Sequence, residues 1–346
     1  MFDLYEKKET KSKATNGNLH KAKVNKNDEF YTQLTDIEKE LMHYKEHFKD
    51  KIVYCNCDDP EWSNFWKYFH LNFAHLGLKK LIATFYHIGA SVYKMEYTGG
   101  DDNNISAGVK IPLTGNGDFR SEECIETLKE SDIVVGNPPF SLARPFVEQL
   151  VTYNKKFLII GDLNWITYKE IFPLIKNNEI WLGFNYVKEF TQPDGTIKKF
   201  GNKLWFTNLD HSKRHEKLPL WKNYTPKEYP KYDNYDAINV DKVTDIPCDY
   251  CDLIGVPITF MNSYCPEQFE IVGTISAPSD KETLNLGKDY SDYIGYNQDR
   301  TPYGRTGSTF GKCPVIVMDD KKHPYYEKNG VRVQATYHRI FIRRKD

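Results

Sequence analysis

Short β-rich runs alternate with helix-like stretches between residues 34 and 184, and this alternation constrains the fold more than any other feature. The pattern predicts strands at 52–57, 81–86, 132–136, 156–161 and 179–184. It predicts helices at 34–48, 63–76, 121–131, 141–153 and 166–177. Such alternation is typical of βαβ units. We therefore predict an α/β fold with a doubly wound parallel sheet covered on both faces, and an antiparallel edge strand at 197–207.

The amino-acid composition of the chain changes at two points. The first 27 residues are rich in Lys and Asn and lack apolar periodicity, which predicts a flexible arm. After about residue 215, Pro, Tyr, Asn and Asp become frequent, and strand-like segments at 253–275 and 331–344 indicate a smaller domain. We therefore predict a basic arm at 1–27, an α/β domain at 28–215 and a second domain at 216–346.

The charge of the chain is unevenly distributed. The formal net charge is -1, but residues 1–27 hold seven Lys against three acidic residues, and residues 300–346 hold eleven Lys and Arg against four. The ends therefore carry +4 and +7, which leaves -12 for residues 28–299. Basic ends on an acidic body suit a protein whose ends contact a polyanion. Two solvated tails would have the same charges.

Composition indicates a globular protein of the cytoplasm. With 40% hydrophobic and 14% aromatic residues, the chain can form a full core, which excludes wholesale disorder. Apolar runs such as 157–160 are far too short to span a membrane, and the first residues lack the apolar segment of a secretory signal. Seven irregularly spaced cysteines suit reduced thiols better than a disulfide framework. We expect a soluble, cytoplasmic protein.

The sharpest motif is Asp132-Ile-Val-Val-Gly-Asn-Pro-Pro-Phe140, a predicted strand that ends in Asn137-Pro138-Pro139-Phe140 and leads into a predicted helix. Open α/β sheets bind their ligands at the carboxyl ends of strands, where this motif lies. The plain alternative is a proline-rich turn between a strand and a helix. The position at a strand end favours a functional role.

The residue types of this motif suit chemistry on an exocyclic amine. Such an amine is a poor nucleophile because its lone pair is delocalised into the ring. Acceptors aimed at its N–H bonds favour a pyramidal nitrogen, and the Asn137 side chain and the Pro138 carbonyl can both accept. The prolines stiffen the loop and remove competing donors. Phe140 offers a flat face on which an extruded base can stack.

The motif resembles the catalytic motif of amino-group methyltransferases that use S-adenosylmethionine, in the form that adenine-N6 enzymes favour. DEFYTQ at 28–33 resembles their N-terminal cofactor motif, and KIVYCNCDDPEWSNF at 51–65 resembles their strand-and-loop cofactor motif. Gly117-Asp118-Phe119 resembles the acidic-aromatic motif that meets the cofactor's adenine. From about residue 18 to residue 346, the chain is similar to the EcoRI-type adenine-specific modification methylases.

This resemblance implies a Rossmann-like class I methyltransferase sheet followed by a target-recognition domain. It implies a site-specific DNA adenine-N6 methyltransferase that uses S-adenosylmethionine on a flipped-out adenine, in a restriction-modification or orphan modification system. The implied partners are double-stranded DNA and a companion restriction endonuclease that shares the site without stable association. We expect a monomer, with no metal.

The resemblance and the residue chemistry together predict three sets of site residues. The catalytic set is Asn137, Pro138, Pro139 and Phe140. The cofactor set is Phe30, Tyr31, Thr32, Cys57, Asp58, Asp59, Asp118, Phe119 and Asn137. The DNA-binding set is Ser141, Arg300, Arg305, Lys312, Arg343 and Arg344. Several of these residues also have a purely structural alternative. The Asp58-Asp59 pair could cap a helix, residues 118–119 could form a turn beside a core aromatic, and residues 300–312 could form a surface loop.

The loop after the first predicted strand departs from the wider methyltransferase superfamily. Residues 59–65 contain no glycine, although many relatives place glycines there so that the backbone can approach the cofactor. The EcoRI-type family shares this Asp-Asp-Pro form. An acid for the ribose hydroxyls is not evident after residues 81–86, and Glu96 is the nearest candidate.

Other chemistries are less well supported. Pro247-Cys248-x-x-Cys251 matches half of a zinc deaminase signature, but no His is followed two places later by Glu. Cys265 and Cys313 have irregular spacing for a structural zinc site, and no phosphate-binding P-loop motif is present. Two rival functions stay open: a methyltransferase of the same fold acting on RNA or a protein glutamine, and a DNA-binding protein whose catalytic site has lapsed.

Overall fold

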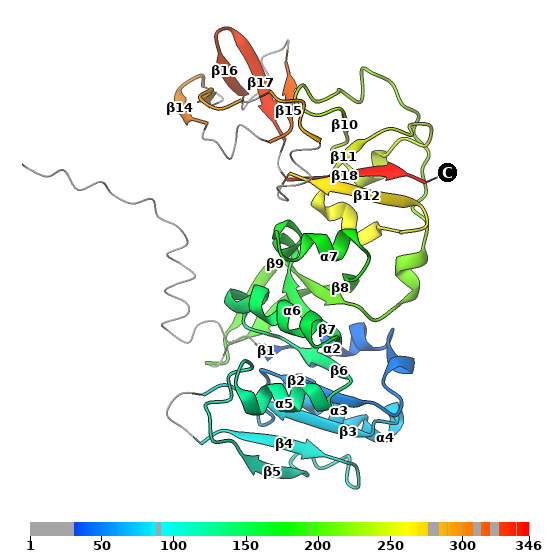
Figure 1. The fold of residues 1–346 in the computed structure, drawn as a ribbon, viewed down its shortest axis with the longest axis vertical. Coiled ribbons are helices and arrows are strands. Elements are labelled where there is room, and N and C mark those ends of the chain that lie inside the picture. The colour runs from blue at the N-terminus through cyan, green and yellow to red at the C-terminus, as the bar shows by residue number, and fades with distance from the viewer. Residues whose placement is uncertain are drawn as a thin grey trace, which may run out of the picture.

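The computed structural model describes most of the chain as three β-sheets, with six α-helices in the described residues. The described residues are 31–87, 91–192, 194–275, 284–288, 290–297, 299–306, 313–318, 325–336 and 338–345. The sheets follow one another along the long axis of the molecule (Figure 1). The predicted arm at 1–27, Phe30 and Lys312 lie outside the described residues.

The largest sheet has nine strands in the order β1-β8-β9-β7-β6-β2-β3-β4-β5. Its strands are β1 (Tyr31–Thr32), β2 (Ile52–Asn56), β3 (Lys80–Thr84), β4 (Tyr93–Tyr97), β5 (Val109–Pro112), β6 (Ile133–Gly136), β7 (Lys156–Asp162), β8 (Trp181–Thr191) and β9 (Ile197–Thr207). The four central strands β7, β6, β2 and β3 are parallel, whereas all other neighbouring pairs are antiparallel. The sheet is therefore mixed, and the predicted parallel arrangement holds only at its centre.

The predicted edge strand at 197–207 is antiparallel, but it does not lie at an edge. This strand, β9, lies between β7 and β8. A tight turn, in which the Gln192 amide donates to the Thr196 carbonyl at 2.8 Å, joins β8 and β9 into a long hairpin. β8 extends to Thr191, whereas the sequence predicted that this strand ends at residue 184. The longer strand pairs with β9 on one side and with β1 on the other.

Ser63 and Ser121 begin two of the helices as N-caps, each accepting hydrogen bonds from backbone amides of the first turn. The α-helices are α2 (Leu34–Leu41), α3 (Asn64–Leu71), α4 (Phe73–Leu76), α5 (Glu122–Glu130), α6 (Ala143–Thr152) and α7 (Phe172–Lys176). The 3₁₀ helices are η1 (Lys45–His47), η2 (Phe140–Leu142), η3 (Leu163–Thr167), η4 (Ser212–His215), η5 (Val243–Asp245) and η6 (Ile258–Ser263). None of the helices in the described ranges is long and apolar enough to cross a bilayer.

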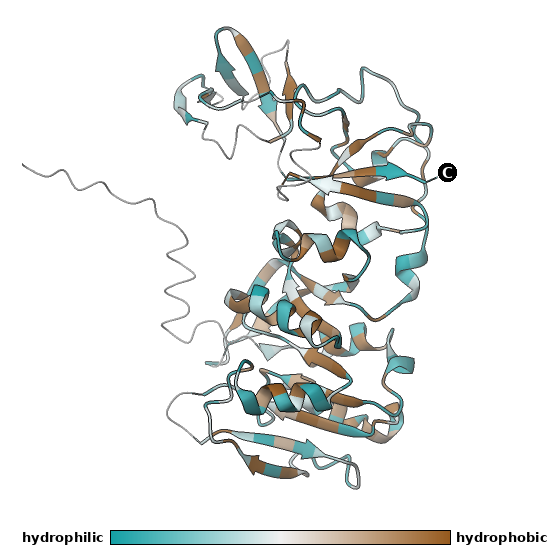
Figure 2. Ribbon diagram, viewed as in Figure 1, coloured by the Kyte–Doolittle hydropathy of each residue, from teal (hydrophilic) through white to brown (hydrophobic). Residues whose placement is uncertain are grey.

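Helices cover both faces of the central strands. Every residue of β2 is buried, as expected for a strand with a core on each side. Ile52 and Tyr54 join the core cluster that includes α5 and α6, whereas Val53 and Cys55 join the cluster that includes α2, α3 and α4. Figure 2 shows hydrophobic residues recurring along the strands of this sheet.

The C-terminal part forms two smaller sheets. One has the order β10-β11-β18-β12, and the other has the order β14-β13-β16-β17-β15. Their strands are β10 (Ile238–Asn239), β11 (Ile254–Pro257), β12 (Phe269–Thr274), β13 (Ile294–Tyr296), β14 (Pro302–Arg305), β15 (Val315–Val317), β16 (Tyr325–Lys328), β17 (Val331–Ala335) and β18 (Arg339–Arg344). Phe172 of α7, Phe260 of η6 and Ile342 of β18 belong to one buried cluster. The four-stranded sheet therefore shares a core with the nine-stranded sheet.

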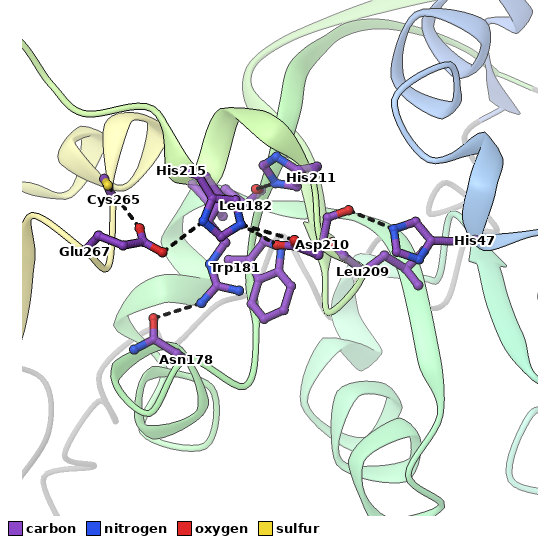
Figure 3. Close-up of polar contacts among 11 residues, drawn as sticks. His47, Asn178, Trp181, Leu182, Leu209, Asp210, His211, His215, Cys265 and Glu267 are labelled. Carbon is purple, nitrogen blue, oxygen red and sulfur yellow. Dashed lines mark hydrogen bonds and ion pairs between the residues drawn. The ribbon is translucent and has the colours of Figure 1, made fainter.

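A polar junction joins the segment after β9 to the segment before β12. His215 contacts Asp210 and Glu267 through opposite ring nitrogens, each at 2.9 Å (Figure 3). Cys265 donates to the same Glu267 carboxylate at 3.2 Å. Hydrogen bonds that the His215 ring donates to Asp210 and Glu267 raise the pKa of His215. The junction therefore holds two segments far apart in sequence through a titratable side chain.

Candidate active site

The carboxyl ends of β2 and β6 meet at the centre of the nine-stranded sheet. From this pair the chain continues to β3 on one side and to β7 on the other, so the strand order reverses between them. Open α/β sheets bind ligands at such a reversal. The Cys57–Pro60 segment follows β2, and the Asn137–Phe140 segment follows β6. The structure therefore brings the two sharpest sequence motifs to one edge of the sheet.

Gly136 lets these two segments touch. A Cβ at this position would overlap Oδ2 of Asp58 and would lie 3.2 Å from the Asn56 carbonyl oxygen. Any side chain at 136 would therefore push the Asp58 carboxylate away from the end of β6. The close approach explains why a glycine directly precedes the Asn-Pro-Pro-Phe motif.

Asp58 is a buried carboxyl group at the reversal, with only 7% of its surface exposed. Its Oδ1 accepts a hydrogen bond from Ser63 Oγ at 2.9 Å, whereas Oδ2 has no well-aligned donor among the described residues. Burial raises the pKa of Asp58 to about 7, against the opposing effects of the Ser63 hydroxyl and the Asn137 backbone amide. A buried carboxyl group of this kind ionises more readily when a cation lies beside it.

The loop that carries Asp58 has an unusual backbone. Cys57 has a φ of 71°, a left-handed conformation that non-glycine residues rarely adopt. The Asp58 amide donates to the Thr84 carbonyl at 3.0 Å, which ties the loop to the end of β3. Asp59 is only partly buried, and its Oδ1 accepts from the Glu61 amide at 2.9 Å. The chain thus turns sharply at Cys57 and places Asp58 inward.

The described part of the N-terminal motif lies against the same loop. Asn64, at the start of α3, donates to the Thr32 carbonyl at 2.7 Å. Thr32 is buried and pairs with Phe190 of β8, and Tyr31 is the preceding residue of β1. Thr32 therefore contacts the residue that follows the loop after β2, and Tyr31 lies next to it in β1.

The Gly117-Asp118-Phe119 segment lies beside the end of β3. Gly117 has a φ of 73°, and a Cβ there would overlap the Phe85 carbonyl oxygen. The neighbouring backbones are also joined by the His87 amide, which donates to the Asn116 carbonyl at 3.0 Å. Only glycine fits such a close approach at this φ. The segment thus reaches the same edge of the sheet as Asp58.

Within this segment, Asp118 and Phe119 already have protein partners. Arg120 contacts the Asp118 carboxylate through two nitrogens, at 2.8 and 2.6 Å. Phe119 is 3% exposed and packs edge-on against Phe146 of α6, with ring centroids 5.1 Å apart. The packing of Phe119 is that of a core residue, which was the plain alternative for this position.

Glu96, the candidate for the ribose hydroxyls, lies on β4 instead of in a loop after β3. Its carboxylate contacts Lys80 and Lys94, each at 2.7 Å. Both lysines lower the pKa of Glu96 although burial opposes them. Its carboxylate therefore belongs to an ion-pair cluster with lysines of β3 and β4.

The Asn137–Phe140 loop leaves the sheet as a short turn into η2. Asn137 is half-buried and its Oδ1 is covered, and Pro138 is buried. The Pro139 carbonyl accepts from the Leu142 amide at 2.9 Å, which closes the first turn. Phe140 is half-buried, so the aromatic side chain retains an accessible surface.

Phe140 belongs to a cluster that sequence reasoning missed. Its ring centroid lies 6.2 Å from that of Phe190 and 6.4 Å from that of Phe200, both edge-on. Lys203 Nζ lies over the Phe140 ring, 4.0 Å from its centroid. We call Phe140, Phe190, Phe200 and Lys203 the Phe140 cluster. Phe200 with lysines at 198, 199 and 203 was a signal for it, but only strand pairing shows which side chains meet.

The predicted DNA-binding residues are spread over the molecule. Ser141 lies in η2 beside the catalytic motif. Arg300 and Arg305 are exposed on the β13–β14 hairpin of the five-stranded sheet. Arg343 pairs with Glu270 at 3.5 Å, and Arg344 donates to the Cys248 carbonyl. Arg343 therefore has a partner on β12, and Arg344 has one in the segment before β11.

The described ranges contain no group of three His, Cys, Asp or Glu side chains that could hold a metal ion. Cys248, from the Pro-Cys-x-x-Cys segment, donates instead to Asn223 at 3.2 Å.

Comparisons with known proteins show the family to which this chain belongs. The sequence profile of a family described as adenine-specific methyltransferase EcoRI matches residues 18–345. The Type II methyltransferase M.EcoRI of Escherichia coli is 50% identical, covering 80% of this chain and 94% of that protein. M.MpnI of Mycoplasma pneumoniae is 39% identical, covering 75% and 86%, and M.MgeORF184P of Mycoplasma genitalium is 38% identical, covering 75% and 87%. No solved structure matches. The chain belongs to the EcoRI family of adenine-specific methyltransferases.

Proposed function

We propose that this chain transfers a methyl group from S-adenosylmethionine to the N6 amine of a flipped-out adenine in double-stranded DNA. The observation that carries the proposal is the meeting of Asn137–Phe140 with the Asp58 loop at the strand reversal. The relatives are named Type II methyltransferases, which supports a role in a restriction-modification system. We propose a monomer that needs no stable complex with a companion nuclease.

The central strand order supports assignment to the doubly wound class I methyltransferase fold. The parallel strands β7-β6-β2-β3 carry helices on both faces, and β9 adds an antiparallel strand beside β7. We assign residues 28–215 to the catalytic domain and residues 216–346 to target recognition. The second assignment is supported by the exposed arginines of the β13–β14 hairpin.

The residues present fit an S-adenosylmethionine site. The donor carries an ammonium group, and Asp58 offers a buried carboxylate whose Oδ2 lacks a well-aligned donor among the described residues. The loop that carries Asp58 also contains Cys57 and Asp59, and Tyr31 and Thr32 of β1 lie beside it. Asp118 reaches the neighbouring strand end, where it would have to share its carboxylate with Arg120. S-adenosylmethionine supplies an electrophilic methyl carbon bonded to a sulfonium.

The catalytic residues act on the amine of the base. An adenine inside a duplex cannot reach the sheet edge, so it has to rotate out of the stack. Asn137 Oδ1 and the Pro138 carbonyl accept the two N6 hydrogens, which directs the nitrogen lone pair toward the methyl carbon. Because Asn137 Oδ1 is covered, its side chain must rotate toward the base. Phe140 stacks on the extruded ring, and alignment supplies the rate.

Methyl transfer from labelled S-adenosylmethionine to unmethylated duplex DNA tests the proposal, with Asn137→Ala beside the wild type. Losing one acceptor that acts in the transition state should lower kcat by about 10²-fold or more. Binding of DNA should persist in the variant, because the recognition surface is separate. Equal incorporation by both proteins, or label in RNA or protein fractions with none in DNA, would contradict the proposal.

A further inference from the structure

Lys203 is a nearly buried cation inside the Phe140 cluster, with 6% of its surface exposed. Its Nζ lies 4.0 Å from the Phe140 centroid and 5.1 Å from the Phe200 centroid. A lysine ammonium at such distances from a ring is attracted by the ring's electron density, more strongly when water is excluded. Lys203 is therefore in direct contact with the aromatic residue of the catalytic motif.

A dedicated acceptor fixes the position of this cation. Lys203 and Asp162 face each other across the β9–β7 pair, and Nζ lies 2.6 Å from Asp162 Oδ2. Asn202 donates to the same oxygen at 2.8 Å, and the Asn164 amide donates to Oδ1 at 2.9 Å. Both oxygens of the carboxylate are therefore used. An ion pair held this way keeps one geometry, because breaking it would leave a buried charge uncompensated.

The location of the pair connects it to the reaction. Asp162 ends β7, and Gly136 ends the adjacent parallel strand β6, so both lie at the carboxyl edge of the sheet. Phe140 follows four residues after Gly136. A base that stacks on Phe140 would use the ring face opposite Lys203. Lys203 of β9, held by Asp162 at the end of β7, thus contacts the ring on which the base is proposed to stack.

We propose that Lys203, fixed by Asp162 and Asn202, is a positioning residue that sets the plane of Phe140 for stacking on the target adenine. This inference rests on the proposed function, since Phe140 is the ring on which the base would stack. Lys203 acts through Phe140 and needs no contact with the base. Its removal should let the Phe140 turn move and should weaken the stacking that holds the extruded adenine.

Lys203→Met tests the role, because Met keeps the length of the side chain and removes its charge. Loss of a largely desolvated cation–ring contact should lower kcat about tenfold, which corresponds to about 1.4 kcal/mol, with little change in the KM for DNA. Fluorescence of 2-aminopurine at the target position should fall, since fewer bases are held out of the duplex. Lys203→Arg should recover most of both signals.

The matched control is Lys199→Met, which removes the same charge from the same strand. Lys199 is exposed and pairs with Glu189 at 2.9 Å, away from Asp162. Its loss should leave the 2-aminopurine signal near that of the wild type. If Lys203→Met does not fold, Lys203→Met with Asp162→Asn removes both buried charges and is measured in the same way.

A double-mutant cycle and hydrogen exchange separate this inference from the proposed function. In a Phe140→Ala background, Lys203→Met should change kcat by less than about twofold, because the two residues act as one unit. Backbone amides of 140–142 should exchange faster in Lys203→Met than in Lys199→Met, whatever the protein methylates. Unchanged exchange, or equal effects in both backgrounds, would overturn the role of Lys203 while DNA methylation by the wild type stands.

Discussion

At the scale of single residues, Asp58 shows how burial prepares a group for a ligand. Burial keeps its carboxyl group protonated up to about pH 7, although hydrogen bonds from Ser63 and the Asn137 amide oppose this effect. A ligand ammonium beside Oδ2 would favour the ionised form. Proton release and ligand binding at this residue should therefore be linked.

We expect the affinity for S-adenosylmethionine to rise between pH 5.5 and pH 7.5 and then to level off, because only ionised Asp58 pairs with an ammonium. Asp58→Asn should bind about tenfold or more weakly at pH 7.5 and should lose the pH dependence. Calorimetric titration of both proteins across this range measures the effect. A wild-type affinity that stays constant over the range would contradict this role for Asp58.

The raised pKa of Asp58 also predicts how the stability of the ligand-free protein changes with pH. The folded chain holds a proton on Asp58 that the unfolded chain releases from about pH 4, so stability should fall as pH rises from 4 through 7. Asp58→Asn should remove this part of the decline. Urea unfolding at pH 4.5 and pH 8 checks the sign, and a wild-type loss no larger than that of the variant would contradict it.

The sequence predicted the site residues that follow strands directly and missed those that meet across strands. Asn137 and Asp58 each follow a buried run, so their place at a strand end could be inferred. Lys203 and Phe190 lie more than 40 residues from Phe140, and their contact with it depends on the register of β7, β8 and β9. Register follows from the whole sheet, which local periodicity does not specify.

At the scale of elements, the central strands were predictable because they are continuous apolar runs. β4 and β5 were missed: β4 alternates polar and apolar residues, and all four residues of β5 are exposed. The predicted helix at 166–177 is shorter in the structure, where α7 carries Pro173 in its first turn. A proline is tolerated there but not in a helix interior, so the helical segment begins late.

The junction around His215 predicts a pH effect at this scale. Its folded pKa is raised by two carboxylates, so its contribution to stability is complete below about pH 6.5 and is lost as pH rises through the folded pKa. His215→Gln should therefore lower the free energy of unfolding more at pH 5.5 than at pH 8.5. The difference should not exceed about 1 kcal/mol, because the pair is partly exposed.

Urea unfolding of wild type and His215→Gln at the two pH values measures this difference. His75→Gln, which changes an exposed histidine of α4, is the matched control. A destabilisation by His215→Gln that is equal at both pH values, or larger at pH 8.5, would show that the charge on His215 does not hold the junction.

At the scale of the whole molecule, the loops after β2 and β6 belong to the nine-stranded sheet, whereas the β13–β14 hairpin belongs to the five-stranded sheet. The four-stranded sheet shares a core with the nine-stranded sheet. If Arg305 contacts a phosphate, Arg305→Ala should weaken binding to all DNA sequences and reduce the salt slope by about one. Arg332→Ala is the control, since Arg332 lies in the same sheet but pairs with Glu327 at 2.6 Å. Equal salt slopes for Arg305→Ala and wild type would remove Arg305 from the interface.

Sequencing of genomic DNA from cells that express this chain, with detection of modified bases, tests adenine methylation by the loop after β6 most directly. We expect N6-methyladenine at one short recurring sequence with the wild type, and none there with Asn137→Ala, at matched protein levels. Methylation at the same sequence by Asn137→Ala, or no modified adenine with the wild type, would contradict the claim that the loop after β6 holds the reacting amine.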